Sequence, residues 1–150
     1  MKKLFYIFIL LFIVGWAQAQ QRVVYTINDG WKFTKGSPFE AQLTGCDDSS
    51  WETVNIPHTW NDKDADDETP GFYRGPVWYR KQLFIDKSQE GRRAMIYFEG
   101  ANQEVRFYLN GQFVGEHKGG YTRFCFDITP HLRYGQENLF AIYVNNVYNP

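Results

Sequence analysis

The chain has 150 residues, 22% of them charged, and its formal net charge is −1 at pH 7. This length suits about one domain, and a near-neutral balance without a lysine- or arginine-rich run excludes the basic face that nucleic-acid binding needs. Aromatic residues make up 19% of the chain, and we expect most of them to fill the interior as bulky apolar side chains.

The first 19 residues are organised like a secretory signal peptide. Lys2 and Lys3 form a basic start, residues 4–16 an apolar run, and residues 17–19 a small-x-small cleavage site. A membrane anchor is the alternative, but the apolar run is shorter than the roughly 18–20 residues that cross a bilayer. The pattern predicts cleavage after Ala19 and bacterial export, to the periplasm or the outside.

The remaining chain consists of short apolar and β-branched segments separated by turn signals. None of them shows a long 3.6-residue apolar period, so any helix should have one or two turns at most. The spacing predicts an all-β sandwich or barrel. The expected strand segments are residues 22–27, 30–33, 77–85, 93–100, 104–116, 123–128 and 138–146.

Local signals refine three of these regions. In residues 104–116, Asn110-Gly111 supplies two positions that tolerate positive φ, which predicts a two-stranded hairpin with a type I′ turn. His117 follows the hairpin, and we expect it to seat the return strand rather than to act in catalysis. Thr129 as a cap, Pro130 at the first helical position and Gly135 as a stop predict one short helix or 3₁₀ turn.

The polar segment before residue 55 predicts another turn. An aspartate of residues 47–48 can cap it, and the turn would carry Trp51 inward. The following segment, residues 55–60, should be extended because Pro57 disfavours a helical conformation at Ile56.

No residue pattern predicts a metal ion or another cofactor. The three histidines lie far apart and lack ligand partners three or four residues away. In the acidic loop 61–75, the aspartates have the 1-3-5 spacing of a calcium loop, but Asp67 and Tyr73 occupy the positions that need glycine and a bidentate glutamate. The loop should be solvated, or should offer carboxylates and amides to sugar hydroxyls.

Cys46 and Cys125 are the two cysteines of the chain. Export would permit a disulfide, although bridging requires close and correctly aimed Cβ atoms. Cys125 lies between Phe124 and Phe126 in an expected strand, where it can serve as a small buried apolar residue. We expect two free thiols, with a disulfide as the alternative.

Several motifs, in the same order, resemble one known family. They are "WETVNIPHTWN", "GPVWYRKQLFI", "YFEGANQEVRFYLNGQFVGEHKGGYTRFCFDIT" and "GQENLFAIYVNN". These segments are similar to the N-terminal sugar-binding domain of glycoside hydrolase family 2, which contains β-galactosidases, β-glucuronidases and β-mannosidases. The resemblance covers about residues 25–148. It implies a galactose-binding-like jelly-roll β-sandwich over residues 20–150, after the signal peptide 1–19.

The resemblance also implies a multidomain enzyme. In the family, an immunoglobulin-like domain and a (β/α)₈ barrel follow, and the catalytic glutamates lie on the barrel. Because a barrel takes about 250 residues, no catalytic residue is assigned to this chain, which we expect to be inactive alone. We also expect the jelly roll to be incomplete at its C-terminus, with at least one closing strand missing and an edge exposed.

By the same resemblance, four residues are candidate contacts to a terminal β-linked sugar. Asn61 and Asp62 follow the "PHTW" motif, and Asn145 and Asn146 end the last strand. Many relatives have Asp-Asn where this chain has Asn145-Asn146, but an amide can still bond a hydroxyl. The alternative is that Asn145 and Asn146 shape the turn alone.

Two other functions stay open at this point. A stand-alone carbohydrate-binding module would stack sugars on loop aromatics such as Trp60, Phe72 and Tyr73. A structural domain would contribute an assembly interface alone. Fold does not decide among these functions, because function depends on sites.

Overall fold

The structure, a computed structural model, describes residues 22–61 and 72–147, and this part of the chain contains eight strands and two 3₁₀ turns. The strands are β1 (Trp31–Lys35), β2 (Glu52–Val54), β3 (Pro76–Ile85), β4 (Met95–Phe98), β5 (Glu104–Leu109), β6 (Gln112–Lys118), β7 (Phe124–Asp127) and β8 (Gln136–Asn145). The turns are η1 (Lys87–Gln89) and η2 (Thr129–His131). No helix in these ranges is long and apolar enough to cross a membrane. The predicted all-β class is confirmed.

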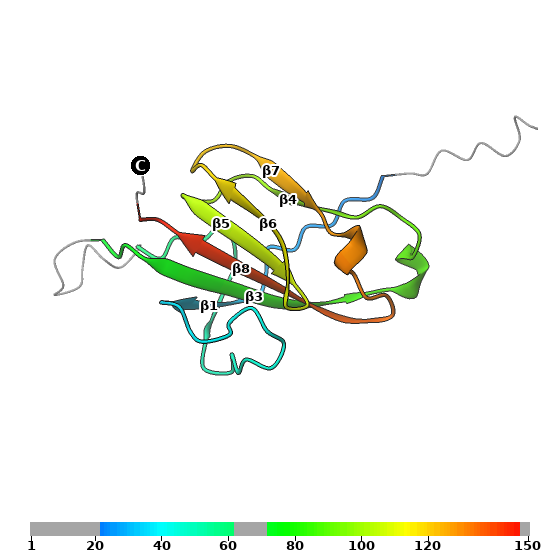
Figure 1. Cartoon of the computed structure of the whole chain (residues 1–150), viewed down its shortest axis with the longest axis horizontal. Helices are drawn as coiled ribbons and strands as arrows, with labels where there is room; N and C mark the ends of the chain where they lie inside the picture. Colours follow the sequence, from blue (N-terminus) through cyan, green and yellow to red (C-terminus); the bar gives the residue numbers. More distant parts are fainter. Residues whose placement is uncertain (1–21, 62–71, 148–150) are drawn as a thin grey trace, which may run out of the picture.

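The strands form two layers (Figure 1). Six are joined in the antiparallel order β2-β1-β3-β8-β5-β6, and β4 pairs with β7 in a second sheet. Successive side chains of a strand point to opposite faces, so the register partners Tyr79 and Ile142 belong to the main core between the layers. Their neighbours Trp78 and Tyr143, also partners, belong to a cluster on the outer face. The predicted sandwich is confirmed.

Aromatic rings fill the main core, as their number predicts. Phe107 of β5 is fully buried. Its ring centroid lies 6.1 Å from those of Phe98 in β4 and Phe126 in β7, and 6.0 Å from that of Phe140 in β8. These separations are within the range of favourable aromatic pairs. The contacts therefore join both sheets through one ring.

The predicted hairpin is also confirmed. β5 and β6 pair antiparallel, with Leu109 opposite Gln112, so Asn110 and Gly111 form a two-residue loop. Their φ angles are 53° and 83°, the positive values that a type I′ turn requires.

Gly115 of β6 is where the hairpin approaches the second sheet. A Cβ atom at this position would lie 2.6 Å from Cε1 of Phe126, well inside van der Waals contact. We expect Gly115→Ala to lower the free energy of unfolding by about 1–3 kcal/mol, because the ring or the backbone must shift. Urea unfolding measures the loss. As a control, Gly45→Ala meets no atom within 4 Å; equal losses in the two variants would contradict the argument.

On the outer face, the buried guanidinium of Arg80 binds the segment between β1 and β2 to the sheet. Arg80 of β3 has 1% of its surface exposed. Its Nη1 donates to the Cys46 carbonyl at 2.9 Å, and its Nη2 donates to the Leu43 carbonyl at 3.1 Å. The guanidinium also lies over the Trp51 ring at 5.5 Å and pairs with Asp48 at 3.4 Å. Trp51 is half-buried in this cluster, as the turn predicts.

Two expectations about strands are wrong. Residues 22–27 belong to neither sheet, and Val24 and Tyr25 are largely exposed. β-branched residues favour a strand where a neighbouring strand pairs with them, and no described strand pairs with these. Cys125 is exposed rather than buried, because Phe124 and Phe126 take the inward positions of β7 and the alternation turns Cys125 outward. Cys125 and Cys46 are both free thiols.

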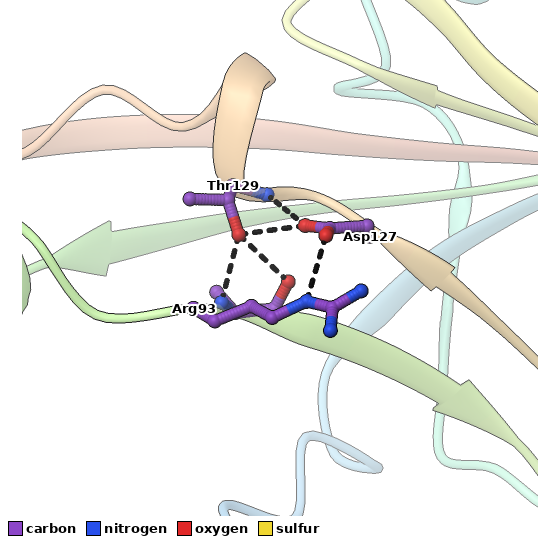
Figure 2. A network of polar contacts seen from close by, with 4 residues as sticks. Arg93, Asp127 and Thr129 are labelled. Atoms are coloured by element: carbon purple, nitrogen blue, oxygen red, sulfur yellow. Dashed lines mark hydrogen bonds and ion pairs between the residues drawn. The ribbon is translucent and has the colours of Figure 1, made fainter. Parts of the chain in front are cut away.

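A polar network ties the start of β4 to the end of β7 (Figure 2). Thr129 donates through its backbone N–H and its hydroxyl to Asp127 Oδ1, at 3.0 and 2.6 Å. Arg93 Nε donates to Asp127 Oδ2 at 2.9 Å, and the Ala94 N–H donates to Thr129 Oγ1 at 2.9 Å. The 3₁₀ turn is confirmed, but Thr129 is its first residue rather than its cap, since its hydroxyl is committed to this network.

The network predicts a pH dependence of stability. Hydrogen bonds from the Thr129 side chain and backbone, and then Arg93, lower the pKa of Asp127 from its ordinary 3.8. Because the pKa is lower in the folded state, Asp127 stabilises the fold above the ordinary value, and this contribution disappears as the pH falls through the lowered one. We expect the Tm of Asp127→Asn to be below that of the parent at neutral pH. The two curves should converge once the pH falls below the lowered pKa of Asp127, which lies under 3.8; a constant gap would contradict the linkage.

Candidate functional site

A pocket of about 420 Å³ opens between the two layers near the C-terminal end of β8. Its apolar wall comes from both sheets and includes Trp31, Tyr79, Ile142, Val144 and Phe98. Its polar lining comes from loops and includes His58, Thr59, Trp60, Asn61, Asn102 and Asn146. A mostly apolar hollow with a few convergent polar groups is the usual form of a small-molecule site.

Two adjacent residues of the lining carry unpartnered polar atoms. Trp60 Nε1, a donor, and Asn61 Oδ1, an acceptor, are both buried without a hydrogen bond. Leaving such an atom buried and unpaired costs about 1–3 kcal/mol, and native structures rarely do so without a reason. The pair therefore leaves one donor and one acceptor unused at the position where the described part of this loop ends.

The structure brings two of the four sequence-predicted contacts to this pocket, Asn61 and Asn146. Asn146 is already engaged, because its Oδ1 accepts from the Gly75 N–H at 2.8 Å and its Nδ2 donates to the Tyr73 carbonyl at 3.0 Å. It therefore fixes the chain entering β3. Asn61 keeps a free acceptor.

The other two predicted contacts are not placed there. Asn145 does not line the pocket, and its Oδ1 accepts from the Val147 N–H at 3.1 Å. This bond shapes the turn after β8, as the alternative interpretation of Asn145 expects. Asp62 lies outside the described residues.

No sequence pattern predicts a histidine at this site, but the structure places His58 in the pocket lining. His58 Nδ1 lies 2.9 Å from the Tyr79 hydroxyl, and the His58 ring meets Phe33 edge-on, with centroids 4.6 Å apart. Burial raises the pKa of the Tyr79 phenol well above its ordinary value, so the hydroxyl stays protonated and can donate to Nδ1. No local spacing reveals this pair, because 21 residues separate its members and the sheet brings them together.

The three aromatic residues of the loops differ in how freely their rings could stack on a sugar. Trp60 is half-buried in the pocket lining, whereas Phe72 is 65% exposed. The Tyr73 hydroxyl donates to the Pro76 carbonyl at 2.8 Å and accepts from the Gly36 N–H at 3.0 Å. Tyr73 is thus committed to the fold and is a poor stacking platform.

His117 has the contacts of a structural residue. Its Nε2 lies 3.0 Å from Thr122 Oγ1, and its ring stacks on Phe124 at a centroid distance of 4.1 Å. These contacts join β6 to β7, which supports the predicted seating role; the larger effect of His117 on stability than on affinity stays a prediction. Within residues 22–61 and 72–147, no cluster of three or more His, Cys, Asp or Glu side chains could hold a metal ion.

The known proteins to which this chain is similar include β-glucuronidases and a β-galactosidase. The chain is 40% identical over 136 residues to a β-glucuronidase of Formosa agariphila, covering 85% of this chain and 14% of that protein. It is 38% identical over 126 residues to a β-galactosidase of Thermoanaerobacter pseudethanolicus, covering 83% and 17%. The solved structure of Bacteroides uniformis β-glucuronidase superposes with a TM-score of 0.80 at 40% identity, over 86% of this chain and 15% of that one.

Residues 15–149 match the family described as "Glycosyl hydrolases family 2, sugar binding domain". The chain belongs to this family, as the resemblance of its motifs predicts. It spans about 14–17% of the length of the relatives named above.

Proposed function

We propose that the chain is the N-terminal sugar-binding domain of an exported bacterial β-glycosidase similar to β-galactosidases and β-glucuronidases. Residues 1–19 are its signal peptide, and residues 20–150 form a galactose-binding-like jelly roll that works in the periplasm or outside the cell. Further polypeptide supplies an immunoglobulin-like domain and the (β/α)₈ barrel. Two barrel carboxylates carry out retaining hydrolysis of the terminal β-linked sugar.

The pocket is the observation that carries this proposal. It combines an apolar wall with polar side chains of the loops, among them Thr59, Asn61 and Asn102, and sugars present C–H faces and hydroxyls that match both. In the proposed enzyme, Asn61 and Asp62 contact the sugar directly. Asn145 and Asn146 bound the same edge and hold the loops that form it.

Hydrolysis tests the proposal. The product of the whole reading frame and the 150-residue chain would be assayed with 4-nitrophenyl β-D-galactoside and β-D-glucuronide. We expect turnover by the first and none by the second. Turnover by the 150-residue chain, free of contaminating enzyme, would contradict the proposal that the catalytic carboxylates lie on a barrel outside this chain. In the longer protein, Asn61→Ala should raise KM, whereas Asn28→Ala, an exposed asparagine outside the pocket, should not.

A stand-alone carbohydrate-binding module is the second candidate, favoured by the exposure of the Phe72 ring. Calorimetry of the chain with oligosaccharides tests it. Phe72→Ala should abolish binding, whereas Phe39→Ala, which removes an even more exposed ring on the segment between β1 and β2, should not. Equal behaviour of the two variants would reject stacking on Phe72.

A further inference from the structure

We propose that the chain forms a weak two-fold dimer in which β4 pairs antiparallel with β4 of a second copy. The pairing joins the two small sheets into one four-stranded sheet of order β7-β4-β4-β7. The proposal concerns the free edge of the second sheet rather than the contents of the pocket, so it does not depend on the function proposed above.

One edge of β4 is unused. In the described part of the chain, β7 is the one strand that pairs with β4. Backbone groups of successive residues in an antiparallel strand face opposite edges. The Ala94 carbonyl accepts from the Ile128 N–H at 3.0 Å, so Ala94 and then Ile96 face β7. Met95 and Tyr97 therefore face the other edge, where no described backbone group bonds to them.

The other sheet edges are less suited to pairing with another chain. β2 has three residues, and the β5–β6 ladder carries a bulge, which distorts the edge strand β6. The second edge of β7 lies beside β6, where the rings of Phe124 and His117 stack. Short strands and bulges protect edges from pairing. The ladder of β4 is regular over its four residues, so its free edge is the available template.

The sequence around β4 is complementary to itself in an antiparallel arrangement. Exposure alternates from residue 93 to residue 99, with Arg93, Met95, Tyr97 and Glu99 exposed and Ile96 buried. A two-fold axis at Ile96 places Arg93 opposite Glu99 of the second copy, and Met95 opposite Tyr97. All four lie on the same outward face, so the two ends of the paired segment carry opposite charges, which stabilise a sheet when they are directly opposite.

The same register satisfies the free backbone groups. Met95 and Tyr97 of both copies face the shared edge, so each Met95 can exchange two hydrogen bonds with Tyr97 of the other copy. An axis moved to Met95 or Tyr97 would remove the opposite charge from Arg93 and Glu99. A slip of one residue in the pairing would set outward side chains against inward ones. The charges and the alternation therefore select one register.

The outward side chains gain from this contact. Met95 is 44% exposed and Tyr97 is 54% exposed, and a thioether beside an aromatic ring is a favourable cross-strand pair. The bond from Arg93 to Asp127 uses Nε, and a guanidinium carries further N–H donors for Glu99 of the second copy. The paired segment is only about seven residues long, so the contact is small and the dimer should be weak.

Amide hydrogen exchange of the 150-residue chain at low and high protein concentration tests the pairing. We expect the Met95 and Tyr97 N–H groups to exchange more slowly at the higher concentration, while the Ile96 N–H is protected by β7 at both. Sedimentation equilibrium should show the average mass rising toward twice that of one chain. A reducing agent prevents the exposed thiol of Cys125 from linking copies covalently.

Charge reversal tests the register. Glu99→Arg places two pairs of like charges across the dimer and should weaken association by about tenfold, and Arg93→Glu should do the same. Mixing the two variants should restore association, because opposite charges then meet at both ends. Glu52→Arg is the matched control, since it changes the charge equally at an exposed position of edge strand β2 and should leave association unchanged.

Three outcomes would overturn the proposal. The first is an average mass that does not rise with concentration. The second is slow exchange of the Met95 and Tyr97 amides at every concentration, which would mean that a chain covers its own edge. The third is equal association of Glu99→Arg and Glu52→Arg, which would place any contact elsewhere. Retained protection of the Ile96 N–H shows that each variant is folded, and the comparison of these two variants decides even if Arg93→Glu does not fold.

Discussion

Arg80→Met is expected to lower the free energy of unfolding by about 3 kcal/mol, one of the two largest effects that the structure predicts. Methionine can fill part of the apolar space of the arginine stem but cannot donate. The Leu43 and Cys46 carbonyls would lose the bonds of 3.1 and 2.9 Å that now satisfy them. Asp48, whose side chain is 29% exposed, can regain water, which keeps the cost below that of a fully buried orphan charge.

Urea unfolding followed by tryptophan fluorescence measures this loss, and Arg93→Met is the matched control. Arg93 also pairs with a carboxylate, at 2.9 Å, but its side chain is 74% exposed. An exposed ion pair contributes about 0–1 kcal/mol, so the control should change little. If both variants lost the same stability, burial of the Arg80 cation would not be the cause.

Strands with a neighbour on each side were predictable from the sequence. β3 and β8 are long, rich in aromatic and β-branched residues, and paired over ten positions, so local pattern and tertiary context agree. The hairpin was predictable because Asn110-Gly111 specifies its own turn. Residues 22–27 are also rich in β-branched and aromatic residues, but no described strand pairs with them. Composition alone could not reveal that they lack a neighbouring strand.

The site was less predictable than the fold. Asn61 could be placed because it follows a recognisable motif, but the free atoms of Trp60 and Asn61 result from how two loops and two sheets enclose them. The family resemblance predicts Asn146 as a ligand contact at the end of the strand, whereas its amide bonds to Tyr73 and Gly75, more than 70 residues away. Long-range hydrogen bonds of this kind leave no local spacing in a single sequence.

Asn138 carries the other large effect. Its side chain is fully buried in β8. Its Oδ1 accepts from the Arg133 N–H at 2.8 Å and from Asn110 Nδ2 at 2.9 Å. Its Nδ2 donates to the Arg133 carbonyl at 2.7 Å and to the Gln136 carbonyl at 3.1 Å. One amide therefore satisfies the turn that enters β8 and the asparagine of the hairpin loop.

Asn138→Leu should lower the free energy of unfolding by about 4 kcal/mol, because leucine keeps the volume and leaves these buried groups without partners. Asn28→Leu, at an exposed position whose side chain bonds to no other residue in the described part of the chain, should stay within about 0.5 kcal/mol of the parent. Amide hydrogen exchange locates the effect: protection of the Arg133 N–H should be lost first in Asn138→Leu, before the β3–β8 ladder opens. A variant as stable as the parent would show that the turn finds other partners and that the amide is not what holds the hairpin loop against β8.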